Sequence, residues 1–422
     1  MVLNYSNADI AIQLNCTGAT TYTKTSYPVF HGRFTIVETA DYIFHFNLNG
    51  EIIRVKGKGQ AWPHPHEWLK RTVGNDWVYV STGGYTGVYE STGEYYLPNF
   101  PYPTNSLLGG HPFADPGVQD LLASWYELLH QCAALAAMAP PAVKTFFASA
   151  LANSPAVLAA KAERLFTLCD GRPTVLPPDA RHVDYQLIPL TVAKGCLYKC
   201  QFCQVKNDRP FVVKSAAAIS TQIAGLADLY GPDLVNYNAL FLGDHDALQA
   251  GAASLLASLD AANRQFSLAE SAIRGCNAFS FGSVTSLLNC PETFFVELEK
   301  GPYTSFINIG LESADQETLN ALGKPITAAL VRQTFARIQD INDRYNSVEI
   351  TANFVFDDDL PKGHYPALLA LIRESLSRNK PKGCVYMSPL QFDQPARAKL
   401  FAFNRLKLAS RVPLFLYIIQ RL

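Results

Sequence analysis

The sequence lacks an excess of charge of either sign. Its 422 residues include 35 Lys and Arg against 36 Asp and Glu, which gives a formal net charge of −1. This balance does not indicate nucleic acid or an anionic membrane surface as the main partner. The chain also lacks any run near the roughly 20 apolar residues of a membrane span. Its first residues lack the basic and apolar regions of a secretion signal. We therefore expect a cytoplasmic protein with no membrane partner.

A regular framework of paired cysteines is also missing, although the chain has nine Cys. The count is odd, and Cys196, Cys200 and Cys203 fall within eight residues. A disulfide framework does not take this form in a chain of this length. The other six cysteines contain no Cys-x2-Cys pair, so the sequence predicts no second cluster. It predicts reduced thiols, with one tight group reserved for a metal.

The texture of the sequence changes along the chain and divides it into four segments. Residues 1–113 alternate apolar and polar positions between Gly and Asn turns, which predicts a β-rich module. Residues 114–182 are rich in Ala and Leu with apolar residues three and four apart, and predict helices followed by a linker. Residues 183–390 repeat strand, loop and helix, and residues 391–422 form a C-terminal extension.

The repeating segment contains six predicted strands, and each of the first five is followed by a predicted helix. Six β–α units in series imply a parallel sheet, either open or partly closed as a barrel. The predicted strands are residues 186–193, 236–243, 264–273 together with 277–282, 304–310, 347–356 and 383–389.

The three clustered cysteines have the spacing Cys-x3-Cys-x2-Cys and follow the first predicted strand. One loop with this spacing can wrap an iron–sulfur cube through three thiolates and leave one iron open for a small molecule. Three other interpretations remain. The three cysteines could lie on one face of a helix, because their spacing matches that period. They could bind zinc with a fourth ligand such as His182, or hold a cluster that only transfers electrons.

The segment AKGCLYKCQFCQVKN resembles the radical S-adenosylmethionine (radical SAM) superfamily. The family signature is a Cys-x3-Cys-x-aromatic-Cys loop after the first strand of a partial (β/α)6 barrel of the TIM type. Cys196, Cys200, Phe202 and Cys203 match it, and the resemblance covers residues 185–390. It implies a 4Fe–4S cluster on the three cysteines, with S-adenosylmethionine at the open iron. It also implies an external electron donor such as flavodoxin or ferredoxin.

Further segments resemble the cofactor contacts of that family. Gly243 and Asp244 follow the second strand, where the family holds the ammonium of S-adenosylmethionine. Glu312 lies in the sequence Gly-Leu-Glu-Ser, so the resemblance implies that it bonds the ribose hydroxyls, and Ser313 belongs to the same motif. Lys324 matches the position that contacts the cofactor carboxylate or steadies its loop.

Several of these polar residues also have simpler interpretations. Ser280 and Ser283 end the third strand, so they are candidates for cofactor or substrate contacts and equally for strand-end and helix N-cap positions. Asp246 is the candidate cap of the helix that it precedes. Glu312 is also a candidate capping residue, and Lys324 a solvated helix end.

The predicted function is a radical SAM enzyme that reductively cleaves S-adenosylmethionine to a 5′-deoxyadenosyl radical, which abstracts hydrogen from an unknown substrate. The alternatives are a non-catalytic iron–sulfur protein for electron transfer or sensing, and a module that delivers a cluster to a partner. The sequence lacks the Asp-x-His-x-x-Gly pattern that would indicate cobalamin binding. The role of the N-terminal region stays open.

Overall fold

A computed structural model describes residues 2–422 except 23–28, 61, 83–87, 103–109, 184–185, 199, 204–209 and 391–396. Its N-terminal part is an eight-stranded antiparallel sheet in which each strand pairs with the next along the chain. The strands are β1 (Leu3–Ser6), β2 (Ile10–Thr17), β3 (Arg33–Thr39), β4 (Tyr42–Phe46), β5 (Ile52–Gly57), β6 (Trp68–Arg71), β7 (Trp77–Ser81) and β8 (Leu97–Asn99), with α1 (Val88–Thr92) between the last two.

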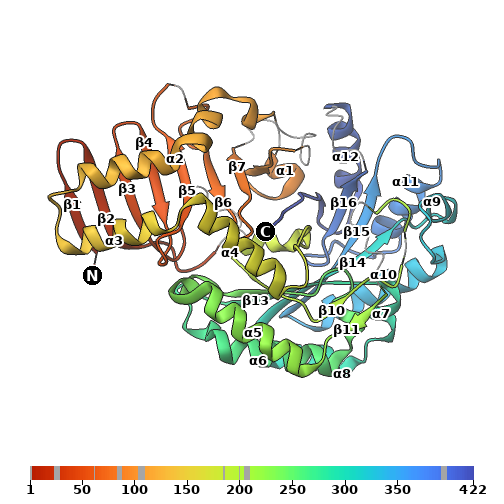
Figure 1. Cartoon of the computed structure of the whole chain (residues 1–422). Coiled ribbons are helices and arrows are strands. Elements are labelled where there is room, and N and C mark those ends of the chain that lie inside the picture. The colour runs from red at the N-terminus through yellow and green to blue at the C-terminus, as the bar shows by residue number, and fades with distance from the viewer. Residues whose placement is uncertain are drawn as a thin grey trace.

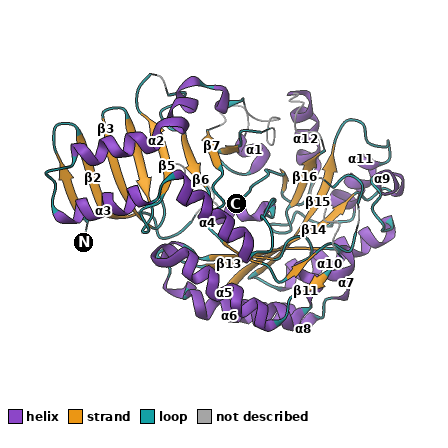
Figure 2. Cartoon of the chain, in the orientation of Figure 1, coloured by secondary structure: helices purple, strands orange, loops and turns teal. Residues whose placement is uncertain are grey.

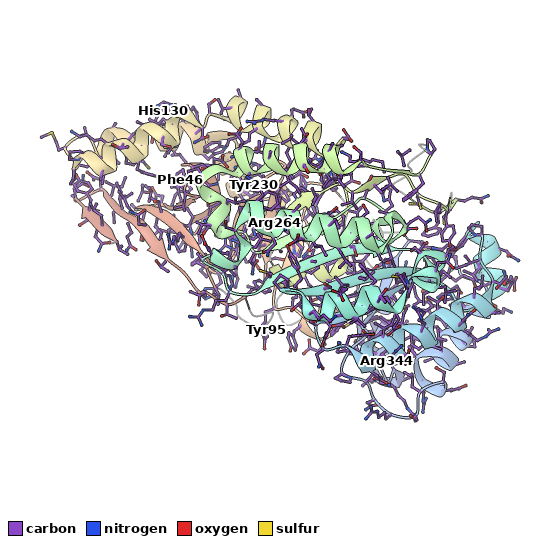
Figure 3. All side chains as sticks on the ribbon, turned by 90° about the horizontal axis from the view of Figure 1, so that it is seen from below. Phe46, Tyr95, His130, Tyr230, Arg264 and Arg344 are labelled. Carbon is purple, nitrogen blue, oxygen red and sulfur yellow. The ribbon has the colours of Figure 1, made fainter. Side chains whose placement is uncertain are left out.

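Two long helices lie across one face of this sheet (Figure 1). They are α2 (Pro116–Leu135) and α3 (Pro141–Ala152), and α4 (Pro155–Leu168) continues from them toward the second sheet. Asp115 caps α2 by accepting hydrogen bonds from the Gly117 and Val118 amides, and Pro occupies the first turn of all three helices. Phe46, labelled in Figure 3, stacks edge-on against Phe146 of α3. The β-rich module and the helices therefore share one core.

The second sheet is parallel and has seven strands in the order β17-β16-β15-β14-β13-β12-β9. Neighbours in space are also neighbours in sequence. The connecting helices α5 (Ala216–Tyr230), α6 (Ala252–Phe266) and α8 (Glu292–Lys300) therefore lie together on the outer side (Figure 2). The strands are β9 (Ile188–Leu190), β12 (Ala239–Leu242), β13 (Cys276–Gly282), β14 (Tyr303–Glu312), β15 (Val348–Phe356), β16 (Val385–Pro389) and β17 (Leu414–Leu416).

Helices and single turns of helix connect or precede these strands. The α-helices are α5 (Ala216–Tyr230), α6 (Ala252–Phe266), α7 (Val284–Asn289), α8 (Glu292–Lys300), α9 (Gln316–Ala321), α10 (Ala328–Arg344), α11 (His364–Leu369) and α12 (Arg397–Ala409). The shorter helices are η1 (Pro112–Ala114), η2 (Pro178–Val183), η3 (Gly231–Asn236), η4 (Ala247–Ala250), η5 (Leu268–Glu270) and the π-helix η6 (Ala370–Glu374). No helix in the described ranges is both long and apolar enough to cross a membrane.

Side chains of the parallel sheet alternate between two cores. Leu240, Ala278 and Ile307 pack against the outer helices, whereas Phe241 and Phe279 pack on the inner face. The inner face near the start of the strands is closed by Leu176 and Ala180 of the linker and by Leu422. This alternation, which follows from the two-residue period of a strand, leaves the inner face near the strand ends for the site.

The structure corrects two expectations about the elements. Residues 264–273 are not a strand, because α6 runs to Phe266 and η5 follows after Ser267, which has a left-handed backbone with φ 49°. Only Cys276–Gly282 forms the third strand. The expected C-terminal extension belongs to the sheet, because it contributes β17, which pairs with β16.

Candidate functional site

The cysteine loop lies between two short strands, β10 (Ala193–Lys194) and β11 (Val212–Val213), which pair antiparallel at its base. Gly195 opens the loop with φ 86°, and a Cβ there would lie 2.5 Å from the Pro210 carbonyl oxygen, so only Gly fits. The described residues of the loop are not helical. The interpretation of the three cysteines as one helix face is therefore wrong.

All three cysteines are half-buried and line one cavity of about 400 Å³. The pKa of Cys200 is raised to about 11, chiefly by burial; Lys324 lowers it, and the charges of Glu312, Cys196 and Cys203 raise it. Burial likewise raises the pKa of the Cys196 thiol. The charges of the three cysteines therefore oppose one another's ionisation, and a cationic metal group would relieve that repulsion.

The same cavity is lined by a buried ion pair at the end of β14. Lys324 Nζ lies 3.3 Å from Glu312 Oε1. It also lies 5.3 Å from the centre of the Tyr198 ring, which belongs to the cysteine loop. Burial alone would lower the pKa of Lys324, but the charges of Glu312 and Cys200 raise it above its ordinary value. Lys324 therefore stays charged beside the cysteines.

The backbone of Gly310–Glu312 has an irregular conformation next to the Glu312 carboxylate. The pairing of β14 with β15 shifts register between Gly310 and Glu312, and Glu312 has φ 64°, which is unusual for a residue with a side chain. A Cβ at Gly310 would lie 2.5 Å from Glu312 Oε1 and 3.3 Å from Lys324 Nζ. Strained backbone that persists in a well-packed region is typical of functional sites.

Two contacts fix the cysteine loop to the helical segments that follow β14 and β13. The backbone N–H of Gln201 donates to the Leu322 carbonyl oxygen at 3.2 Å, and the Gln201 side chain lies against Gly323. On the other side, Tyr198 Oη lies 2.6 Å from Thr285 Oγ1, in the first turn of α7. The cysteines are thereby held over the carboxyl ends of the parallel strands, where the active sites of β/α folds lie.

The segment after β12 places its acidic residues differently from the expectation. Gly243 makes the predicted turn with φ 80°. Asp244, however, pairs with Lys194 at 3.5 Å and is not part of the cavity wall. Asp246 and His245 line the cavity instead. Burial lowers the pKa of His245, so the ring is neutral at pH 7.

The sequence predicts that Asp246 caps the helix it precedes, but its side chain makes no capping hydrogen bond there. Its Oδ1 accepts from the Ser283 amide at 3.0 Å and from Ser286 Oγ at 2.8 Å, at the start of α7. Its side chain is buried, and Oδ2 has no hydrogen-bond partner among the described residues. A carboxylate of the cavity wall thus has one oxygen without a partner in the described part of the chain.

The structure brings together most of the residues predicted from the sequence and separates the rest. Ser280 is two residues from Ala278, so its side chain lies on the outer face of the sheet and does not reach the cavity. Ser313 Oγ is hydrogen-bonded to His364 Nδ1 at 2.8 Å. The predicted residues in the cavity wall are Cys196, Cys200, Cys203, Phe202, Ser283, Glu312 and Lys324, and those outside it are Gly243, Asp244, Ser280 and Ser313.

Sequence reasoning missed Asn308 of β14 and Asn353 of β15, which line the inner part of the cavity. A signal for Asn308 was present in the sequence, because it lies two and four residues before Gly310 and Glu312 and so shares their face of the strand. A buried amide in a strand marks a position that needs a polar partner.

No protein-family model matches the chain, and no curated protein matches it. Among solved structures, it matches the cobalamin-dependent S-adenosylmethionine radical enzyme OxsB with aqua-cobalamin and S-adenosylmethionine bound, at 12% identity and TM-score 0.36 over 56% of this chain and 32% of that chain. It also matches methylornithine synthase (PylB), at 11% identity and TM-score 0.34 over 60% and 68%. A radical SAM methyltransferase from Sphaerobacter thermophilus matches at 14% identity and TM-score 0.33 over 55% and 65%.

The chain is similar in structure to solved radical SAM enzymes. The matched part spans only about a third of the OxsB chain. The function is therefore argued below from the cavity and its residues alone.

Proposed function

We propose that this chain is a radical SAM enzyme in which Cys196, Cys200 and Cys203 hold a 4Fe–4S cluster. The observation that carries the proposal is that three thiols from one short loop share a cavity with a buried carboxylate–ammonium pair at the ends of parallel strands. When bound, the cluster supplies the electron that cleaves S-adenosylmethionine to a 5′-deoxyadenosyl radical for hydrogen abstraction. An external reductant such as flavodoxin or ferredoxin supplies that electron, and the seven-stranded sheet provides the family's partial barrel.

The donor set fits a cluster of this kind. Three thiolates satisfy three irons and leave the fourth open, which is the arrangement of a catalytic rather than a closed metal site. No group of three or more His, Cys, Asp or Glu side chains in the described ranges is arranged around a single metal ion. A cube instead takes each thiolate on a different iron, so its ligands surround the cube rather than converge on a single ion, and all three cysteines line the cavity.

The other wall residues suit the polar groups of S-adenosylmethionine. Glu312 presents two acceptor oxygens, which match a ribose diol, and Lys324 holds that carboxylate in place. We propose that Asp246, rather than Asp244, accepts the ammonium of the methionine part through its free Oδ2. The apolar wall formed by Phe202 and Phe281 excludes water from the reacting atoms.

Replacing one cysteine tests this proposal. Cys200→Ala leaves two thiolates, so anaerobic reconstitution should give less than half the wild-type iron and sulfide and no 5′-deoxyadenosine, while circular dichroism stays unchanged. Cys384→Ala is the matched control, because Cys384 is also half-buried but lies outside the cavity. Wild-type cleavage by Cys200→Ala would reject the ligand assignment. A cluster that forms in the wild type without cleaving S-adenosylmethionine would favour an electron-transfer, sensor or delivery role.

A further inference from the structure

The inner wall of the cavity carries two amide side chains that belong to none of the roles above. Asn308 lies on β14, two residues before Gly310. Asn353 lies on the adjacent strand β15, where it pairs with Gly310, and both line the cavity. Asn308 is fully buried, and Asn353 keeps 9% of its surface exposed. Their nearest link is a hydrogen bond of 3.2 Å from Asn308 Nδ2 to Asn353 Oδ1.

A chain of buried hydrogen bonds fixes the orientation of both amides. Asp179, from η2 of the linker, accepts from Tyr386 Oη at 2.6 Å and from Thr351 Oγ1 at 2.8 Å. Since the Thr351 hydroxyl hydrogen is used in this way, its oxygen must accept from Asn308 Nδ2, at 2.9 Å. Both hydrogens of the Asn308 amide are thus committed, and its Oδ1 points away from them.

Two polar atoms of these amides take no part in this series of hydrogen bonds. Asn308 Oδ1 is buried and accepts no hydrogen bond from any described residue. Asn353 Nδ2 has no hydrogen-bond partner in the described part of the chain either, because only its Oδ1 is used. A buried acceptor without a partner destabilises a fold, so such atoms usually meet a ligand or a water. The cavity that both residues line is where that partner would enter.

We propose that Asn308 and Asn353 recognise a neutral ligand edge that places an N–H donor beside a carbonyl or ring-nitrogen acceptor, as a carboxamide or a nucleobase does. Asn308 Oδ1 accepts the donor, and Asn353 Nδ2 donates to the acceptor. Two sources carry this chemistry, the adenine ring of S-adenosylmethionine and a separate substrate. As a substrate assignment, the inference rests on the proposed function, while the recognition itself does not need a cluster.

Small probes test the recognition directly in the full chain, with and without a reconstituted cluster. Benzamide offers both a donor and an acceptor, acetophenone offers only the acceptor, and benzoate replaces the donor with negative charge. One hydrogen bond contributes about tenfold in affinity, so we expect benzamide to bind about tenfold more tightly than acetophenone and at least as much more tightly than benzoate. Ligand-observed NMR titration measures all three on the wild type, and equal affinities would overturn the proposal.

Variants assign the preference to these residues. Asn308→Leu keeps the approximate volume and removes the acceptor, so the preference for benzamide over acetophenone should vanish. Asn353→Leu should weaken both of these carbonyl probes, because it removes the donor. A preference that survives in folded Asn308→Leu would contradict the assignment, and the wild-type probe series decides the matter even if a variant fails to fold.

A third arm separates the two sources. If Asn308→Leu weakens S-adenosylmethionine about tenfold by isothermal titration, the edge is the cofactor's adenine, and if that affinity is unchanged, it belongs to a separate substrate. Failure of the proposed function would look different. The wild type would then form no cluster or cleave no S-adenosylmethionine, while the selective binding of benzamide would persist.

Discussion

The buried pair of Glu312 and Lys324 allows a quantitative test of how the site is held. Lys324→Met keeps the length of the side chain and removes its charge, so the Glu312 carboxylate is left buried without a counter-charge. The two side chains are only 11% and 6% exposed, respectively. Water therefore compensates only in part, and Lys324→Met should destabilise the cluster-free chain.

The distance gives the scale of the effect. At 3.3 Å and an effective dielectric constant of about 20, the attraction is about 5 kcal/mol. Burial of both charges offsets part of this, and removing one partner of a buried pair costs about 3–5 kcal/mol. The left-handed backbone of Glu312 adds strain that the pair helps to hold. Because the unfolding entropy of a 422-residue chain is about 0.9 kcal/mol/K, we expect the melting temperature to fall by about 3–6 °C.

Thermal unfolding followed by circular dichroism measures this fall, and a double-mutant cycle isolates the pair. Glu312→Gln together with Lys324→Met leaves no buried charge, so it should recover most of the loss. Lys300→Met is the matched control, because the Lys300–Glu297 pair is shorter, at 2.8 Å, but its side chains are 65% and 52% exposed. That control should change stability by less than about 1 kcal/mol. A small loss in Lys324→Met, or additive losses in the double variant, would refute the reasoning.

Three further predictions concern the same cavity and its support. Gly310→Ala puts a Cβ 2.5 Å from the carboxylate of the ion pair, so it should cost about 1–3 kcal/mol by urea unfolding, whereas Gly59→Ala, with open space around it, should cost nothing measurable. Asp246→Asn should weaken S-adenosylmethionine binding about tenfold by isothermal titration, and Asp244→Asn should not; the reverse order would reject our choice of carboxylate. Burial raises the pKa of Asp179 to about 6, above its unfolded value of about 3.9, so its ionisation costs stability as pH rises from about 4 through 6. The melting temperature of Asp179→Asn minus that of the wild type should therefore increase across that window and then level off, and a difference independent of pH would contradict this.

The parallel sheet and the cysteine loop could be predicted because their signals are local. Alternating strand and helix patterns placed strands β12, β14, β15 and β16 within a few residues of their observed bounds. The third strand was extended too far, because the apolar residues of 264–273 fit a strand and a helix end equally well. What ends α6 there is the left-handed backbone of Ser267, which composition does not reveal.

The polar residues of the site were harder to predict, because each depends on which way a side chain turns. Asp244 and Asp246 are two residues apart, and the bend before η4 alone decides that Asp246 meets the cavity. Ser280 could have been placed correctly, because it is two residues from Ala278 and so lies on the same face of the strand. Asn308 could have been found in the same way. The role of Asp179 was beyond sequence reasoning, because it depends on a linker that folds against β15 and β16.

The most direct test of the central claim is electron paramagnetic resonance of the anaerobically reconstituted, reduced protein with and without S-adenosylmethionine. We predict the signal of a reduced 4Fe–4S cluster in the wild type, with g values that shift when S-adenosylmethionine is added, because it binds the iron that no cysteine holds. The absence of a cluster signal, or a signal that S-adenosylmethionine leaves unchanged, would contradict the account.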